Sequence, residues 1–359
     1  MNILVALSGG VDSSVSAALL LEAGHDVVGG FIKNWSDTKD LWTGECAWRV
    51  ERRDALRVTA KLGISLLTFD FEEQYRSRVL EKMFAEYEAG RTPNPDILCN
   101  QEIKFGLFFE EARRLGFDAI ATGHYARVSH DERGAHLLRG NDSTKDQSYF
   151  LQRMSREALA HTLFPIGHLK KTEVRTLAER FSLPVAQKPD SQGICFVGKL
   201  DMPTFLRKRI PSRPGAILDE MGRVLGTHDG LDAYTIGQRH GLGVSLEGKT
   251  WYVAKKHRVN NTLSVVSERN HPWLFPPSFS LEDVHWLQPA YEKVDHFEGD
   301  IVARYHQAPI RATIHRLDAT HATLTPHTPL WAPASGQSVA IYLGSECLGG
   351  GVLMEDTLA

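Results

Sequence analysis

The chain has 359 residues, of which 42% are hydrophobic and 24% charged, the balance of a globular protein rather than a disordered or fibrous one. This length predicts two or three domains, and a formal net charge of −3 excludes a globally basic field for nucleic acids while allowing a local basic patch. No stretch has the roughly 20 apolar residues of a bilayer span, and the opening residues lack the basic region of a signal peptide. We therefore expect a cytoplasmic protein with no membrane contact.

The first 200 residues alternate between strand-like and helix-like segments. The short apolar runs predict buried strands, and the amphipathic runs predict helices. The βαβαβα order indicates an α/β fold with a doubly wound parallel sheet, whose ligands bind at the carboxyl ends of the strands. Strands are predicted at 3–7, 27–32, 65–69 and 118–122, and helices at 14–22, 46–62, 72–88 and 103–115.

The pattern of the sequence changes after residue 200, where the alternation of strands and helices ends. Proline and glycine separate short strand-like segments, which predicts a small central β-rich domain at 201–271 after an N-terminal domain at 1–200. This central segment has eleven Lys and Arg against seven Asp and Glu, so it is locally basic. HPWLFPP at 271–277 resembles a linker, and the alternating pattern beyond it predicts a C-terminal β-barrel in a domain at 272–359.

The four cysteines are far apart in the sequence, at positions 46, 99, 195 and 347. They form no CxxC or CxxxxH cluster, so we expect no structural zinc, no iron–sulfur cluster and no other protein-held metal. A disulfide framework is not expected in a large cytosolic chain. Cys46 and Cys347 have no reactive loop context and are interpreted as structural.

The string SGGVDSS at 8–14 lies between the first predicted strand and the first predicted helix. Its glycines allow a turn whose N–H groups approach a phosphate, and the helix N-terminus adds a favourable dipole. The loop lacks the lysine of a Walker A motif. The alternative interpretation is an ordinary tight turn in which Asp12 or Ser13 caps the helix.

SGGVDSS is also the signature of the ATP pyrophosphatases, which this chain resembles. Members of that superfamily cleave ATP between the α and β phosphates, often to adenylate a carbonyl oxygen. The resemblance explains a phosphate loop without a lysine directed at the γ-phosphate. By itself it admits amide-forming synthetases, tRNA-modifying enzymes and thiolases.

A second polar loop, TPNPDILCN at 92–100, carries Cys99 three residues after Asp96. A helix that begins near residue 102 would place Cys99 at its N-terminus, where the dipole favours a thiolate. Asp96 is a candidate general acid or base for the same site. A single cysteine of this kind is more often a small buried hydrophobe, but DSQGICF at 190–196 presents a second loop cysteine, Cys195.

These strings together resemble the tRNA 2-thiouridylase family of ATP pyrophosphatases over residues 1 to about 355. Further matching stretches are TGHY at 122–125, KDQSYF at 145–150, YTIGQR at 234–239 and GQS at 336–338. The resemblance implies a tRNA-uridine 2-sulfurtransferase that uses ATP with its associated Mg²⁺. Its partners would be tRNA and a persulfide-donating sulfur-carrier protein or cysteine desulfurase.

The resemblance also implies site residues. Cys195 would carry a persulfide, Cys99 would be the second catalytic thiol and transient disulfide partner, and Asp96 would face the target base with Asn94 and Pro95. The residues implied for ATP are Ala6, Leu7, Ser8, Gly9, Gly10, Val11, Asp12, Ser13, Ile32 and Gly123. Those implied for tRNA are His124, Lys145, Asp146, Gln147, Arg304, Tyr305 and Gln337.

The residue types fit this chemistry, because adenylation converts a poor carbonyl leaving group into AMP, and sulfur transfer from a persulfide needs a second thiol. Two alternatives stay open at this stage. An amide-forming, ATP-dependent synthetase would explain the phosphate loop but not the two cysteines. A non-catalytic RNA-binding protein would use ATP only as a structural ligand.

Overall fold

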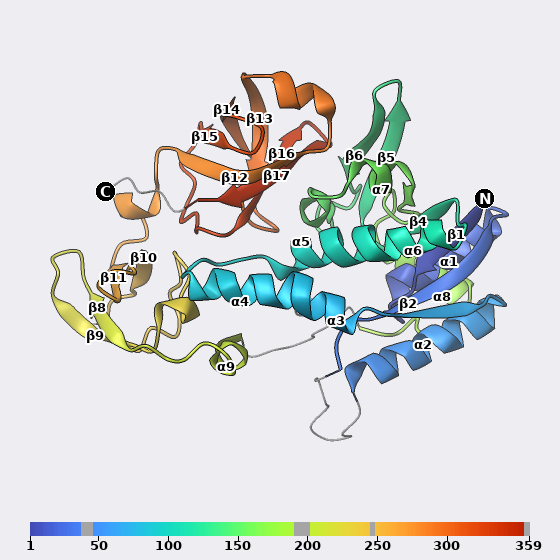
Figure 1. Ribbon diagram of the computed structural model, residues 1–359, viewed down its shortest axis with the longest axis horizontal. Helices are drawn as coiled ribbons and strands as arrows, with labels where there is room; N and C mark the ends of the chain where they lie inside the picture. The colour runs from blue at the N-terminus through green and yellow to red at the C-terminus, as the bar shows by residue number, and fades with distance from the viewer. Residues whose placement is uncertain (37–45, 190–201, 245–247, 355–359) are drawn as a thin grey trace.

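The computed structural model describes residues 1–36, 46–189, 202–244 and 248–354, and its first sheet confirms the predicted doubly wound fold (Figure 1). All pairings in this five-stranded sheet are parallel, in the order β3-β2-β1-β4-β7. Its strands are β1 (Asn2–Ala6), β2 (Asp26–Lys33), β3 (Leu66–Asp70), β4 (Ala119–Ala121) and β7 (Thr162–Leu163).

The sheet is buried on both faces, which is why β1 is continuously apolar. Ile3 and Val5 pack with α1 (Val11–Glu22) and α2 (Ala47–Leu62), whereas Leu4 packs on the opposite face. That opposite cluster includes residues of α6 (Phe108–Arg114). Two further helices belong to this part of the chain, α7 (Arg156–Ala160) and α8 (Lys171–Arg180), with a 3-10 turn at Ser148–Leu151.

Two long helical segments cross the middle of the molecule (Figure 1). The helix predicted at 72–88 is present as α3 (Glu72–Tyr75), a π-helical turn (Arg76–Leu80) and α4 (Glu81–Glu88). The second comprises α5 (Pro95–Cys99), a π-helical stretch (Asn100–Leu107) and α6.

The second helical segment begins earlier than its predicted start at residue 103. The Asn94 side chain caps it by accepting from the N–H groups of Asp96 at 3.1 Å and Ile97 at 3.4 Å, and Pro95 occupies the first turn. The expectation that Cys99 precedes a helix N-terminus is therefore wrong. Cys99 is the last residue of α5 and is fully buried.

The central region forms a four-stranded sheet in the order β10-β11-β8-β9, preceded by α9 (Met202–Arg207). Its core contains the fully buried Ile217, Val253, Leu263 and Val265. The predicted linker is packed rather than loose, because its 3-10 turn (Pro272–Leu274) buries Leu274 completely. The strands are β8 (Gly215–Leu218), β9 (Val224–His228), β10 (Tyr252–His257) and β11 (Thr262–Val266), with a 3-10 turn at Leu231–Ala233.

The C-terminal strands close into the predicted barrel, because β12 pairs with both β15 and β17. The order around it is β12-β15-β14-β13-β16-β17. The strands are β12 (Phe279–Trp286), β13 (His296–Val302), β14 (Ile310–Arg316), β15 (Ala322–Pro326), β16 (Ser338–Leu343) and β17 (Glu346–Leu353), with a 3-10 turn at Pro289–Lys293.

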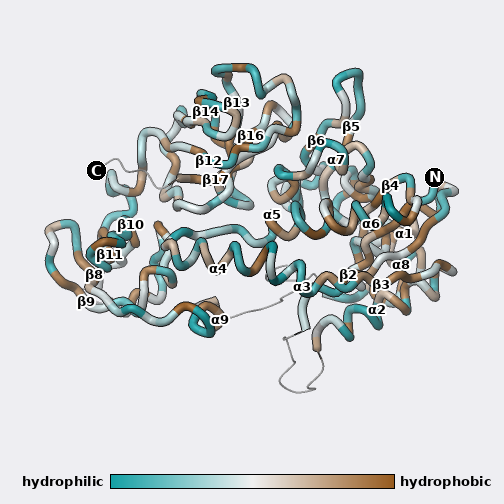
Figure 2. Tube along the Cα trace, in the orientation of Figure 1, coloured by the Kyte–Doolittle hydropathy of each residue, from teal (hydrophilic) through white to brown (hydrophobic). Residues whose placement is uncertain are grey.

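A hairpin of the first 200 residues joins this C-terminal sheet, which the sequence did not predict. It consists of β5 (Ala126–Asp131) and β6 (Gly134–Arg139), and Leu137 of β6 pairs with Cys347 of β17. The tip of the hairpin is hydrophilic (Figure 2). Cys347 is fully buried, and burial raises the pKa of its thiol to about 12. A thiol in that state is unreactive, which agrees with a structural role.

Candidate active site and nucleic-acid interface

The SGGVDSS loop follows β1 and leads directly into α1. Gly10 is the N-cap of α1, and no side chain caps the helix, so capping by Asp12 or Ser13 does not occur. Instead the Ser8 and Ser13 hydroxyls lie 3.2 Å apart, and Ser13 Oγ also accepts from the Ser8 N–H at 3.2 Å. The loop thus combines an uncapped helix N-terminus with two clustered hydroxyls, an arrangement suited to an anion.

Asp12, in the first turn of α1, is held by residues from two other segments. Lys171 at the start of α8 contacts both carboxylate oxygens of Asp12, at 2.7 and 2.8 Å. The Tyr125 hydroxyl donates to Asp12 Oδ1 at 2.9 Å. The carboxylate is 32% exposed and its lysine partner 15%, so this charge pair is only partly screened by water.

Two glycines allow the backbone to approach this loop closely. Gly9 has φ +71°, and a Cβ there would lie 2.3 Å from the Glu51 carbonyl oxygen. A Cβ on Gly123 would lie 2.5 Å from the Ser13 nitrogen. Any larger residue at either position would displace the loop or the helix start. The fold therefore places Gly123 against Asp12 and Ser13, which the sequence also predicted for ATP.

The remaining residues predicted for ATP belong to the neighbouring strand ends. Ala6 ends β1 and pairs with Gly30, and the N–H of buried Leu7 donates to the Gly30 carbonyl at 2.9 Å. Ile32 lies further along β2, is 5% exposed and packs in the core. Its side chain supports the strand end at which ligands bind in such sheets.

Three charged side chains lie next to the loop. Glu51 and Asp54 belong to α2, and Lys188 follows α8. Lys188 Nζ donates to the Gly9 carbonyl at 3.0 Å and pairs with Asp54 at 2.7 Å. Burial raises the pKa of the neighbouring Glu51 to about 7, although Lys188 opposes the shift. Glu51 therefore holds a proton over part of the neutral range.

His124, which was predicted to contact tRNA, is buried beside this site. It is 9% exposed, with Nδ1 2.7 Å from Thr122 Oγ1 and Nε2 3.4 Å from Lys104 Nζ. Burial, reinforced by the Lys104 charge, lowers the pKa of His124 well below its usual value. A neutral ring accepting from Lys104 therefore fixes the position of that ammonium.

The TPNPD segment lies where the three regions of the chain meet. The Thr92 N–H donates to the Ser335 carbonyl at 2.8 Å, and the Thr92 hydroxyl lies 3.3 Å from that of Thr235. Gly336 has φ +85°, and a Cβ there would lie 2.8 Å from the Thr92 nitrogen. Asn94 and Asp96 are half-buried and Pro95 is buried at the start of α5. Cys195 lies outside the described residues.

Apart from His124, the predicted tRNA residues divide into two groups. In the first, the Asp146 carboxylate accepts from Arg139 at 3.2 Å and from the Gly140 N–H at 3.0 Å. Gln147 Oε1 accepts from the Tyr125 N–H at 3.0 Å. These two side chains therefore stabilise the fold around Tyr125, and Lys145 beside them is half-buried.

The second group lies between the central sheet and the barrel. Arg304 donates to Gln337 Oε1 at 3.2 Å and to the Ile236 carbonyl at 3.1 Å. Burial lowers the pKa of Arg304, and burial raises the pKa of Tyr305 to about 12. The Tyr305 ring lies 4.5 Å from that of Phe150. Arg304 and Gln337 are thus brought together, and the aromatic cluster links them to the KDQSYF segment.

Three residues at the SGGVDSS loop were not predicted from the sequence, namely Tyr125, Lys171 and Lys188. Tyr125 lies in the matching stretch TGHY but was given no role. Lys171 and Lys188 lie in no recognised motif, and only the fold brings them near residues 8–14. In the described part of the chain no group of three or more His, Cys, Asp or Glu could hold a metal. No described helix is long and apolar enough to cross a bilayer.

Comparison with known proteins matches three consecutive family models. Residues 1–199 match a tRNA methyl transferase HUP domain, 203–267 a tRNA methyl transferase PRC-barrel domain and 277–353 an aminomethyltransferase beta-barrel domain. A solved 4-thiouridine synthetase–RNA complex with bound ATP is similar over 58% of this chain and 50% of its own, but at 15% identity and a TM-score of 0.35 it carries no argument.

Curated relatives are similar over nearly the whole chain. The tRNA-specific 2-thiouridylase MnmA of Leptothrix cholodnii is 46% identical over 98% of this chain and 96% of its own. That of Enterococcus faecalis is 44% identical over 98% of this chain and 95% of its own. Three domain models match consecutive segments of the chain, and both relatives are more than 40% identical over 98% of it. The chain therefore belongs to the tRNA-specific 2-thiouridylase family.

Proposed function

We propose that this protein is an ATP-dependent tRNA-uridine 2-sulfurtransferase that converts the wobble uridine at tRNA position 34 to 2-thiouridine. The observation that carries the proposal is the uncapped phosphate loop with Asp12 in its first helical turn, in a chain 46% identical to a 2-thiouridylase. The wobble position and the order of steps come from the family resemblance.

The first step is adenylation of the uridine C2 oxygen. That oxygen attacks the α-phosphate of ATP, pyrophosphate leaves, and the oxygen becomes part of an AMP ester. The two serine hydroxyls and the N-terminus of α1 supply donors for phosphate oxygens. Mg²⁺ enters with ATP as part of the substrate, and the Asp12 carboxylate is a ligand type that it prefers.

Sulfur then replaces the activated oxygen. The terminal sulfur of a Cys195 persulfide attacks C2, AMP leaves with the oxygen, and the base is left bonded to Cys195 through a disulfide. The Cys99 thiolate attacks Cys195 Sγ, which forms a Cys99–Cys195 disulfide and releases the 2-thiouridine sulfur with the electron pair. A thiol reductant restores both cysteines.

The substrate tRNA spans the three domains in this proposal, with boundaries at 1–200, 201–271 and 272–359. Asn94, Pro95 and Asp96 contact the target base. Lys145, Asp146 and Gln147 contact the tRNA as one segment, in which the Lys145 ammonium carries the charge opposite to that of a phosphate. Arg304, Tyr305 and Gln337 form a second contact with the tRNA. His124, whose Nε2 lies 3.4 Å from Lys104 Nζ, contributes a third.

The partner that loads Cys195 is a persulfide-donating sulfur-carrier protein or a cysteine desulfurase, and the reaction takes place in the cytoplasm. Nucleoside mass spectrometry of tRNA from a deletion strain tests the function. Loss of 2-thiouridine, restored by the wild-type gene, is expected. Unchanged nucleosides would support an amide-forming synthetase or a non-catalytic RNA-binding protein instead.

A further inference from the structure

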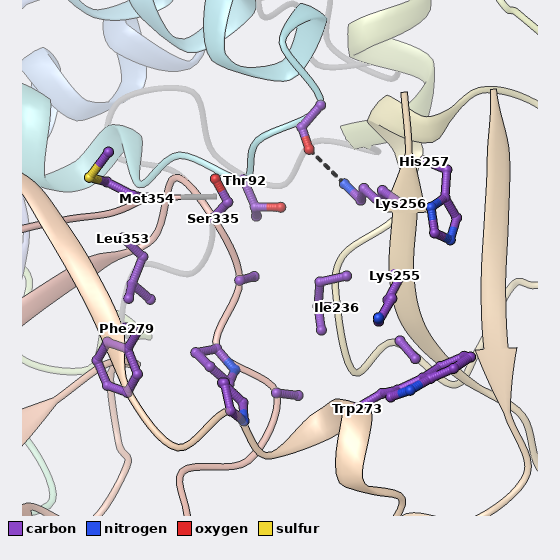
Figure 3. A pocket seen from close by; sticks show the side chains of 16 residues that line it. Thr92, Ile236, Lys255, Lys256, His257, Trp273, Phe279, Ser335, Leu353 and Met354 are labelled. Carbon is purple, nitrogen blue, oxygen red and sulfur yellow. Dashed lines mark hydrogen bonds between the residues drawn. The ribbon is translucent and has the colours of Figure 1, made fainter. Parts of the chain in front are cut away.

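A cavity of about 370 Å³ lies at the junction of the three regions (Figure 3). This volume falls within the range of small-molecule sites. One side is formed by β10 and the turn that carries Trp273, and the other by Phe279 and Leu353 of the barrel. Thr92 closes the side nearest the N-terminal domain.

The lining combines cations with flat apolar surface. Two lysines and one histidine line the cavity, and none of its described lining residues is acidic. The Lys255 ammonium lies 4.7 Å from the ring centre of Trp273, and no carboxylate in the described part of the chain pairs with it. Trp273 is 36% exposed, so its ring is accessible. A ligand with a planar ring and a negative charge matches this pair.

Two other residues of the lining are already part of the packing. The Ser335 carbonyl accepts from the Thr92 N–H at 2.8 Å, and Ser335 Oγ is buried, so this hydroxyl is not open to a ligand. Lys256 differs from Lys255, because its ammonium donates to the Gly90 carbonyl at 3.0 Å and holds β10 against the N-terminal domain.

The position of the cavity indicates which ligand it takes. Thr92 precedes Asn94 by two residues, so their Cα atoms lie within about 7 Å of each other. A tRNA whose target base reaches Asn94 therefore has a neighbouring nucleotide beside the cavity. The wobble uridine and its neighbours belong to the unpaired anticodon loop, so a neighbouring base can leave its stack without breaking a base pair.

We propose that this cavity is a subsite for one unstacked nucleotide of the tRNA next to the target uridine. Its base stacks on Trp273, and its phosphate pairs with Lys255. The inference rests on the proposed function, because it takes the substrate to be tRNA. A free nucleotide has the same chemistry, so the test separates the two sources.

The test measures equilibrium binding of unmodified tRNA to the full-length protein over a salt series. Trp273→Leu should weaken binding about tenfold with the salt slope unchanged, and Trp273→Phe should restore most of the affinity because it keeps an aromatic face. Lys255→Met should lower the salt slope by about one. Lys293→Met, an equal charge change on an exposed turn that does not line the cavity, should leave affinity and slope unchanged.

Ultraviolet crosslinking adds a direct readout, with the crosslink expected on the peptide that contains Trp273. Wild-type affinity in the Trp273→Leu and Lys255→Met variants would overturn the subsite. Suppression of that crosslink by AMP or ATP alone would assign the cavity to a free nucleotide and overturn the tRNA source. If wild-type protein makes no 2-thiouridine yet binds tRNA through these residues, the proposed function fails while the subsite stands.

Discussion

The phosphate loop and the junction around Thr92 are built in opposite ways. The loop is one continuous string, residues 8–14, between a strand and a helix, and contacts from Tyr125 and Lys171 complete it. The junction has no such string, because Thr92 meets Thr235 of the central region and Ser335 beside the barrel. A local motif thus forms the first region, and domain packing forms the second.

This difference divides the proposed reaction. In that proposal the loop would hold ATP, whereas the junction would face the tRNA. Substitutions in the loop should therefore affect ATP cleavage without changing tRNA affinity. Those at the junction should do the reverse, and the predictions below test that separation.

The largest effect is expected for Cys99 and Cys195, the two thiols of the proposed sulfur transfer. Cys99→Ser and Cys195→Ser should each stop thiolation, but only Cys195→Ser should prevent loading of the persulfide. After one turnover without reductant, peptide mapping should find a Cys99–Cys195 disulfide, for which their Cα atoms must approach within about 7 Å. Cys347→Ser serves as a control, since that thiol is fully buried in the barrel and Cys347 pairs with the hairpin through its backbone. A Cys99 that stays reduced throughout would refute the pair.

Asp12→Asn should slow AMP formation about 100- to 1,000-fold, because it removes the charge at the loop while keeping an acceptor for Tyr125. The affinity for tRNA should not change, and circular dichroism should show an intact fold. A fall in tRNA affinity equal to the fall in rate would show that the two regions are not separate.

Gly336→Ala should weaken tRNA binding about tenfold and leave ATP binding intact. The new Cβ would lie 2.8 Å from the Thr92 nitrogen, so the junction must open. Gly344→Ala is the matched control, since Gly344 also has positive φ, +60°, but nothing within 4 Å of its Cβ position. If the two substitutions weaken tRNA binding equally, the loss comes from backbone strain alone and the prediction for the junction is wrong.

The last prediction concerns stability rather than activity or tRNA affinity, and it involves Glu51, beneath the loop. Burial raises its folded pKa from 4.5 to about 7, so the folded protein retains a proton that the unfolded chain has released. The Glu51 contribution to stability therefore falls as pH rises from about 4.5 to 7. Glu51→Gln should stabilise the protein by up to about 3 kcal/mol at pH 8 and hardly at all at pH 4.5. Thermal unfolding of both proteins between pH 4.5 and 8 measures this difference in stability. A difference that stays constant with pH would contradict the prediction.

The same division explains what the sequence predicted. Periodicity and the glycine motif gave the parallel sheet, the helix at 72–88 and the loop, because each depends on neighbouring residues. The hairpin β5–β6 was missed because its pairing with β17 joins Leu137 to Cys347, far apart in the chain. The start of α5 was missed because Asn94 caps a helix whose first residue is a proline, in a segment interpreted as a loop.

The roles of single residues were harder to predict than the motifs. Lys171 reaches Asp12 only through the packing of α8 on α1, and no local pattern marks it. Asp146 and Gln147 lie in a recognisable string, and their side chains also bond within the protein, while their contact with tRNA stays a prediction. A motif therefore indicates which segment matters, while the contacts decide what each side chain does.

The most direct test of the account is the stoichiometry of one turnover. Purified protein carrying the Cys195 persulfide is mixed with unmodified tRNA and MgATP, and the nucleotides and tRNA nucleosides are quantified together. The account predicts AMP, pyrophosphate and 2-thiouridine in equal amounts, with the sulfur at position 34. Formation of ADP and orthophosphate, or AMP and pyrophosphate without any 2-thiouridine, would contradict it.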